Sequence, residues 1–338
     1  MFLKRIHWVQ LITLMLIVAA MVGACSTTTI SAPEPTKQPP PADAASPEST
    51  KAPPPTEEPT TEPIVLVDGL GRNVILQAPA ARVISMAPNT TEMLYAVGAG
   101  SQVVGRDDFS DYPIEVVDVA SIGSTYGALN TEAMIGLEPD LVLAASLHTP
   151  EQVQSLEALD ITVFYLSNPS DFEGVYEALR LVGVLTGHED EAIALGEELR
   201  TRVDAVVETV AGVDPILVYY EVDGSDQTAP WTTGSNTFQD VLIRSIGGEN
   251  VAGDLEFWST ISLEELIARD PKVMFFAAGP WVPTTPESVA ERPGWGDITA
   301  VAMGSVYGID TNLIDRIGPR LVDALEQMAE LLHPDLFE

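Results

Sequence analysis

The sequence is poor in cysteine and in basic residues. Its 338 residues include one cysteine, and 16 lysines and arginines stand against 50 aspartates and glutamates, which gives a formal net charge of −34. One cysteine excludes an intramolecular disulfide framework and a zinc site built from Cys-x-x-Cys pairs. The acidic balance argues against binding to nucleic acid or to an anionic lipid surface, because both partners are themselves negatively charged.

Motifs of catalysis are missing as well. The sequence has no G-x-S-x-G elbow, no P-loop and no complete dinucleotide-binding fingerprint. From residue 64 onward its histidines stand only at positions 148, 188 and 333, too dispersed to predict a zinc or manganese site. We therefore expect a protein that is not an enzyme and has no metal or cofactor of its own. His148 follows an expected strand, so it is a candidate ligand contact.

Residues 1–25 have the pattern of a secretion signal. A short basic start precedes an apolar run from Val9 to Ala20, and small residues follow it. The only cysteine, Cys25, comes next, and the segment Val22–Cys25 resembles the lipobox of bacterial lipoproteins, in which the cysteine is acylated. A transmembrane anchor is the alternative, but the run is short for a span and no basic stop-transfer cluster follows it.

Residues 26–63 differ in composition from the rest. Eleven of these 38 residues are proline, and most others are serine, threonine, alanine or glutamate. Such a segment has little to bury and is predicted to be a disordered tether. It leaves residues 64–338 as the folded part. Four of the 16 basic and six of the 50 acidic residues precede that part, so 12 and 44 remain in it.

Short apolar segments alternate with helical segments throughout the folded part. After a hairpin at 65–67 and 74–76, strands are expected at 83–86, 103–104, 141–144, 163–166, 216–220, 273–277 and 306–309. This alternation predicts an α/β fold with parallel sheets covered on both faces. The two groups of strands suggest two Rossmann-like lobes, at 64–188 and 212–338.

One amphipathic helix separates the two groups. Between residues 189 and 210, apolar residues recur at steps of three and four, and acidic residues crowd the start. We expect residues 189–211 to be a single long helix that links the lobes. A ligand site is then expected between them, at the carboxyl ends of the strands.

Aromatic residues gather in the segments that follow the expected strands. A large, flat and partly apolar ligand would use such side chains, which are costly to leave exposed otherwise. Each could instead pack on its own lobe. The candidate ligand contacts from these segments are Phe109, Asp111, Tyr112, Tyr126, Trp231, Trp258 and Trp281.

Several motifs, in order, resemble one known family. They include Asn89–Glu92, Ser110–Pro113, Glu138–Ala144, Gly247–Val251, Ile261–Leu266 and Gly318–Arg320. The family is the substrate-binding proteins of ABC importers for iron–siderophore complexes and cobalamin. The resemblance implies two α/β lobes joined by one rigid helix, and a monomer that delivers its ligand to a permease with its ATPase. It also implies an extracytoplasmic location, in the periplasm or on the outer face of the cell membrane.

Two carboxylates correspond to permease-docking positions of this family. Glu92 and Glu264, one in each lobe, match the residues that dock into arginine pockets of the permease. Glu92 has an alternative role, because Asn89 and Glu92 have the spacing of a capping box. For Glu264, capping by Ser262 and Glu265 would leave its side chain free to face outward.

The resemblance also bears on the ligand. Ser110–Pro113 matches a loop of the cobalamin-binding members, Tyr126 takes the position of a stacking tryptophan, and Trp231 and Trp258 stand where those members have aromatic residues. Anionic siderophores require basic residues, of which Arg316 is one candidate contact. With so few of them, cobalamin or an uncharged or cationic ferric hydroxamate is favoured. Haem and an oxyanion remain as alternative ligands. A sensor without a transport role and a surface-anchored hydrolase remain as alternative functions.

Overall fold

The computed structural model describes residues 62–280 and 282–337. These residues belong to one structural unit. The predicted signal peptide, Cys25 and all but the last two residues of the predicted tether lie outside the described residues. Within the described part, none of the helices combines the length and the apolar character needed to traverse a membrane.

The folded part begins with the predicted hairpin. Strands β1 (Ile64–Val67) and β2 (Asn73–Leu76) pair antiparallel, with Ile64 opposite Leu76. The Asp68 carboxylate closes the turn, because it accepts hydrogen bonds from the backbone N–H groups of Leu70 and Arg72, both at 3.0 Å. The same carboxylate forms an ion pair with the Arg72 side chain.

The first lobe is built on a four-stranded parallel sheet. Its strand order is β4-β3-β5-β6. The central strand β5 is buried along its whole length, as expected for a parallel strand covered on both faces. The elements are β3 (Val83–Ser85), α1 (Pro88–Ala96), β4 (Val103–Arg106), α2 (Thr131–Gly136), β5 (Leu141–Ala145), α3 (Pro150–Glu157), β6 (Val163–Leu166) and α4 (Phe172–Thr186).

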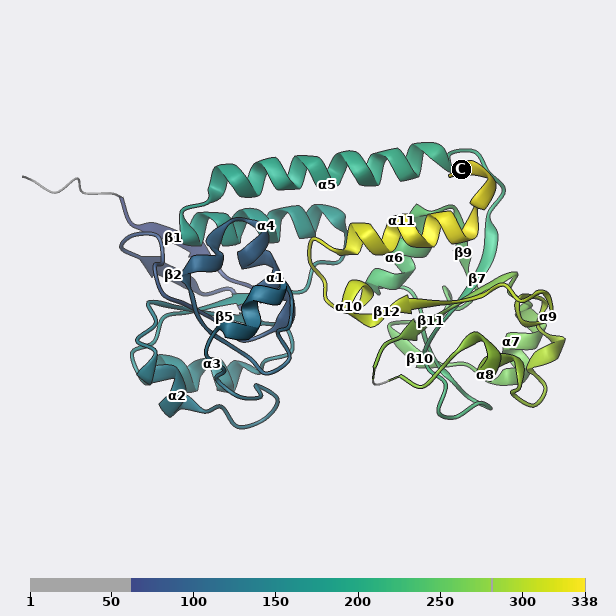
Figure 1. Ribbon diagram of the computed structural model, residues 1–338, viewed down its shortest axis with the longest axis horizontal. Coiled ribbons are helices and arrows are strands. Elements are labelled where there is room, and N and C mark those ends of the chain that lie inside the picture. The colour runs from purple at the N-terminus through teal and green to yellow at the C-terminus, as the bar shows by residue number, and fades with distance from the viewer. Residues whose placement is uncertain (1–61, 281, 338) are drawn as a thin grey trace, which may run out of the picture. The chain divides into compact units, whose positions relative to one another are not determined.

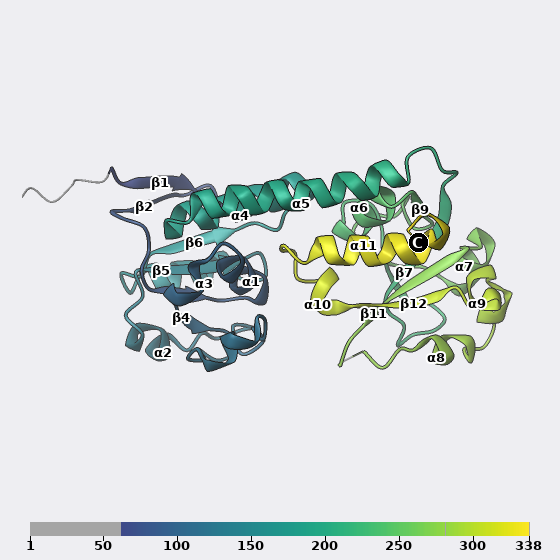
Figure 2. The ribbon, with the colours of Figure 1, turned by 45° about the horizontal axis from the view of Figure 1, so that its top comes forward.

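The predicted linking helix is present as α5 (Glu189–Thr209). It runs along both lobes in Figures 1 and 2 and packs against α4 and α11 (Leu321–Leu332). Its close contact with α4 depends on Gly183, where a Cβ atom would lie only 2.6 Å from the Cβ of Ala192. The buried face of α5 includes Leu199 and Val206, in agreement with the apolar periodicity of the sequence.

The second lobe has a mixed sheet, in which antiparallel pairs extend a parallel set of strands. Its strand order is β10-β8-β7-β11-β12, and β9 pairs with the first residues of β7, whereas β8 pairs with the last ones. Strands β7, β9, β11 and β12 run parallel, whereas β8 pairs antiparallel with β7 and β10 pairs antiparallel with β8. The bounds are β7 (Ile216–Asp223), β8 (Trp231–Thr233), β9 (Gly248–Asn250), β10 (Trp258–Thr260), β11 (Val273–Ala278) and β12 (Val306–Asp310).

Short helices cover this second sheet. They are α6 (Phe238–Ser245), α7 (Leu263–Arg269), α8 (Pro286–Ala290), α9 (Thr299–Met303), α10 (Thr311–Ile314) and α11. The apolar core is continuous between the lobes, because one cluster of buried residues includes side chains from α4, α5, α6 and α11. Phe172 at the start of α4 meets Phe238 at the start of α6 edge to face, with ring centroids 5.3 Å apart.

A buried ion pair organises the loops beyond β7. Arg292 donates two hydrogen bonds to Glu221, at 2.5 and 2.8 Å, and both side chains are almost completely buried. The Arg292 guanidinium also lies 4.4 Å from the ring centroid of Trp295, whose indole N–H donates to the carbonyl of Gln227. Gly224 leaves room for this pair, since a Cβ there would lie 2.4 Å from both side chains.

Replacing Arg292 is expected to destabilise the fold strongly. Arg292→Met would leave the Glu221 carboxylate buried without a partner, which typically costs about 3–5 kcal/mol. Urea unfolding followed by circular dichroism measures this change. The double variant Glu221→Gln/Arg292→Met removes the stranded charge and should lose clearly less. Equal losses in the two variants would contradict the assignment of the cost to the unpaired carboxylate.

Candidate functional site

The loop after β4 is held by a buried carboxylate and exposes aromatic side chains. Asp107 is buried, and its carboxylate accepts hydrogen bonds from the backbone N–H of Phe109, at 3.1 Å, and from the Ser110 hydroxyl. Burial raises the pKa of Asp107 despite these hydrogen bonds. With this anchor inside, Phe109 and Tyr112 remain about half exposed, at 47% and 46%.

Phe109 is joined by Tyr126 from the next loop. The two rings meet edge to face, with centroids 5.4 Å apart and an interplanar angle of 80°. Tyr126 is 65% exposed, and the loop that carries it is held by Gln152, which donates to the carbonyls of Thr125 and Gly127. Two successive loops thus build one exposed aromatic pair on the first lobe.

A second aromatic pair lies on the antiparallel edge of the second sheet. In the register of β8 and β10, Thr260 pairs with Trp231 and Trp258 pairs with Thr233. Because alternate residues of a strand share a face, the two tryptophans lie on the same face as diagonal neighbours. Both are about half exposed.

Phe257 adjoins this second pair and is also about half exposed. Its φ of 54° is unusual for a bulky residue. Its backbone is held by two hydrogen bonds: the Phe257 carbonyl accepts from the N–H of Gly234, and the Phe257 N–H donates to the carbonyl of Ser235. Phe257 is not among the residues predicted from the sequence, although two adjacent aromatic residues, Phe257 and Trp258, indicate an exposed aromatic site.

Glu92 does not lie where a docking residue would. It is 2% exposed, and its carboxylate accepts hydrogen bonds from Arg320, at 2.8 and 2.5 Å, and from Arg316, at 3.2 Å. A carboxylate with these partners cannot present itself to another protein in this arrangement. The capping-box prediction for Glu92 is also wrong, because the N-cap of α1 is Ala87 and no side chain caps the helix.

His148, which was predicted to contact a ligand, is buried instead. It is buried to 98%, and its Nδ1 accepts a hydrogen bond of 2.9 Å from the backbone N–H of Ala145. Burial lowers its pKa. The side chain therefore belongs to the turn between β5 and α3, and its burial keeps it from contact with a ligand.

The remaining candidates divide into three groups. Glu264 is exposed in the first turn of α7, and Ser262 accepts the N–H of Glu265 as predicted. Arg316 is near the first aromatic pair, but it is bonded to Asp111 at 2.5 Å and to the carbonyl of Phe109 at 3.4 Å. Trp281 and Cys25 lie outside the described residues.

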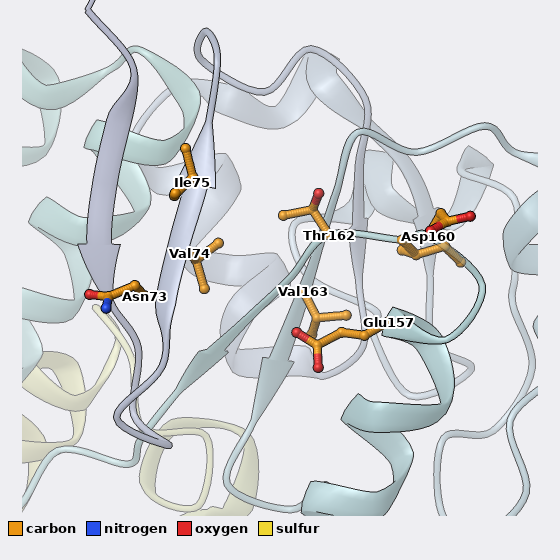
Figure 3. A pocket seen from close by; sticks show the side chains of 8 residues that line it. Asn73, Val74, Ile75, Glu157, Asp160, Thr162 and Val163 are labelled. Carbon is orange, nitrogen blue, oxygen red and sulfur yellow. The ribbon is translucent and has the colours of Figure 1, made fainter.

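One small pocket lies elsewhere on the first lobe. It separates the hairpin strand β2 from the segment between α3 and β6, and Figure 3 shows Asn73–Ile75 on one side and Glu157 and Asp160 on the other. Its volume is about 230 Å³, below the roughly 300–1,000 Å³ typical of ligand sites. This pocket is therefore too small for a metal chelate of the predicted kind.

Metal ligands do not converge in the described part of the chain. No group of three or more His, Cys, Asp or Glu side chains there is arranged to hold a metal ion. The chemistry that the described site offers is stacking and apolar contact from the aromatic pairs, with polar groups around the first pair.

Comparison with known proteins gives consistent matches. Residues 83–313 match the family described as periplasmic binding protein. A cobalamin-binding protein of Halobacterium salinarum is 30% identical over 94% of this chain and 84% of its own length. An ABC transporter substrate-binding lipoprotein of Bacillus subtilis is 29% identical over 82% of this chain and 87% of its own.

A solved structure agrees with these matches. A periplasmic solute-binding protein of Staphylococcus epidermidis superposes with a TM-score of 0.67 at 27% identity. The superposition covers 75% of this chain and 99% of the other. The two-lobed α/β architecture predicted from the sequence is thereby confirmed.

Proposed function

Because the chain belongs to the periplasmic binding protein family, we propose that it captures a large, flat metal chelate, with cobalamin first among them, and delivers it to an ABC importer. The observation that carries the choice of ligand is the pair of exposed aromatic clusters, Phe109 with Tyr126 on one lobe and Trp231 with Trp258 on the other. Exposed aromatic groups of this size suit a flat, partly apolar ligand. The similarity to a cobalamin-binding protein over most of both chains supports the same ligand class.

Removing the tryptophans is expected to weaken cobalamin binding. An aromatic contact contributes about 0.5–1.5 kcal/mol beyond its buried area, so Trp231→Ala and Trp258→Ala should each raise the Kd about threefold to tenfold. Isothermal titration calorimetry measures this without depending on tryptophan fluorescence. Trp258→Phe should retain most of the affinity, and Met303→Ala, at an exposed position of α9, is the control. Unchanged Kd values for both alanine variants would remove these tryptophans from the site.

Docking to the permease is assigned to Glu264 on the second lobe. Its side chain is exposed, while the neighbouring Glu265 is tied to Arg269 at 2.8 Å. An exposed carboxylate facing an arginine cluster would orient the complex through charge-assisted hydrogen bonds.

Charge reversal tests this assignment. Glu264→Lys should abolish ligand uptake and stimulation of the transporter ATPase in proteoliposomes, because lysine would repel the arginine cluster. The Kd for the ligand should change less than twofold, since α7 carries none of the proposed ligand contacts. Glu330→Lys, on the exposed side of α11, is the matched control. Normal uptake by Glu264→Lys would contradict the docking role.

Membrane attachment is assigned to acylation of Cys25. The lipobox-like segment Val22–Cys25 and the tether after it would keep the folded part near the membrane while allowing it to move. Cys25→Ser should move the protein from the membrane fraction to the soluble extracytoplasmic fraction and abolish incorporation of labelled palmitate. Ser26→Ala is the control, and a Cys25→Ser protein that stays membrane-bound and labelled would refute the assignment.

A further inference from the structure

The basic side chains of the described residues are all engaged by the protein itself. Residues 62–337 contain 12 lysines and arginines. Arg82 and Arg106 donate to backbone carbonyls. The other ten form ion pairs with carboxylates: Arg72, Arg180, Arg200, Arg202, Arg244, Arg269, Lys272, Arg292, Arg316 and Arg320.

Arg316 and Arg320 are the basic residues in contact with the aromatic loop after β4, which carries Phe109 and Tyr112. Both belong to the segment between α10 and α11 of the second lobe, and both side chains are 15% exposed. Arg316 reaches the carbonyl of Phe109, and the Arg320 guanidinium lies 3.9 Å from the ring centroid of Tyr112. An anionic ligand bound to these aromatic residues would be attracted by these two guanidinium groups.

The guanidinium groups of Arg316 and Arg320 are already paired with carboxylates. Glu92 holds Arg320 through two hydrogen bonds and Arg316 through one, and Asp111 holds Arg316. Asp107 lies near enough for Arg316 to act on its titration. The two positive charges therefore face at least two full negative charges, which leaves no net attraction for an anion.

The arrangement also resists exchange of partners. Glu92 is almost completely buried, so an anion that withdrew Arg316 and Arg320 would leave a carboxylate without a partner in a buried position. Burial would lower the pKa of Arg316, but its bonds to Asp111 and Glu92 outweigh this effect and leave the pKa raised. The guanidinium thus stays charged and committed to these carboxylates.

We propose that Glu92 and Asp111 determine ligand specificity by neutralising Arg316 and Arg320, so that the site selects uncharged or cationic chelates and rejects polyanionic ones. This inference rests on the proposed function and names the charge class of its ligand. Glu92 is then a positioning residue for the two arginines.

The test compares chelates that differ in charge. Kd values are measured by calorimetry for cyanocobalamin, an uncharged ferric tris-hydroxamate and a trianionic ferric tris-catecholate, with the intact protein and with Glu92→Gln. The intact protein should bind an uncharged chelate at least 100-fold more tightly than the catecholate. Glu92→Gln frees Arg320 and removes one of the two carboxylate partners of Arg316. The ratio of catecholate Kd to uncharged-chelate Kd should therefore fall at least tenfold, and added salt should reverse the change.

Two further variants control for folding and for overall charge. Asp111→Asn removes a partner of Arg316, and the Asp111 side chain is 62% exposed, so this variant should fold. It replaces Glu92→Gln in the test if thermal unfolding shows that Glu92→Gln is not folded. Glu132→Gln changes the net charge equally at an exposed position of α2 and should leave the ratio unchanged.

The outcomes separate the inference from the proposed function. Tight catecholate binding by the intact protein, or a ratio that does not move in Glu92→Gln and Asp111→Asn, overturns the specificity role while the binding function stands. An equal shift in Glu132→Gln also overturns it. If the intact protein binds none of the chelates, the proposed function fails. Gain of catecholate binding in Glu92→Gln would then still support the charge role, and no gain would overturn it.

Discussion

The ion pairs of Glu92 with Arg316 and Arg320 hold the two lobes together near the loop that carries Phe109 and Tyr112. It belongs to α1 of the first lobe and accepts three hydrogen bonds from Arg316 and Arg320 of the second. A buried carboxylate needs such partners, since ionised groups are costly to remove from water. The need of one side chain thus fixes the α10–α11 segment against the loop that carries Phe109 and Tyr112.

A second, apolar connection supports the first. The core continues through α4, α5, α6 and α11, and the contact of Phe172 with Phe238 joins helices of the two lobes directly. Arg202 on α5 adds ion pairs to Asp323 and Glu326 on α11. The lobes are thus joined by apolar packing along the linking helix and by charge at Glu92. Because packed cores deform little, this connection resists deformation.

The sequence predicted the repeating elements of the fold well. The linking helix and the parallel strands follow from apolar periodicity, which local packing preserves. Strands β8 and β10 escaped prediction because they have three residues each, too few to show a period in the sequence. The two exposed tryptophans were nevertheless expected at a ligand surface, and their shared face became visible only through the register of these strands.

The errors at the site have a common physical origin. Glu92 has capping-box spacing with Asn89, but its partners lie 224 and 228 residues further along the chain. His148 follows a strand, but its ring turns back to the backbone of Ala145. In both cases, the local pattern is compatible with several roles, and a tertiary hydrogen bond selects one of them.

The burial of Glu92 also changes how the acidity of the protein should be understood. Most of the 44 acidic residues in 64–338 have no basic counterpart, since only 12 basic residues are available. Surface acids of this number favour solubility and repel anions at long range, an effect that salt screens. Glu92 acts differently, because it is buried and its effect on Arg316 and Arg320 is local. Long-range repulsion would weaken in salt, whereas a guanidinium already bound to a buried carboxylate stays occupied, so the two mechanisms together exclude anions over a wide range of ionic strength.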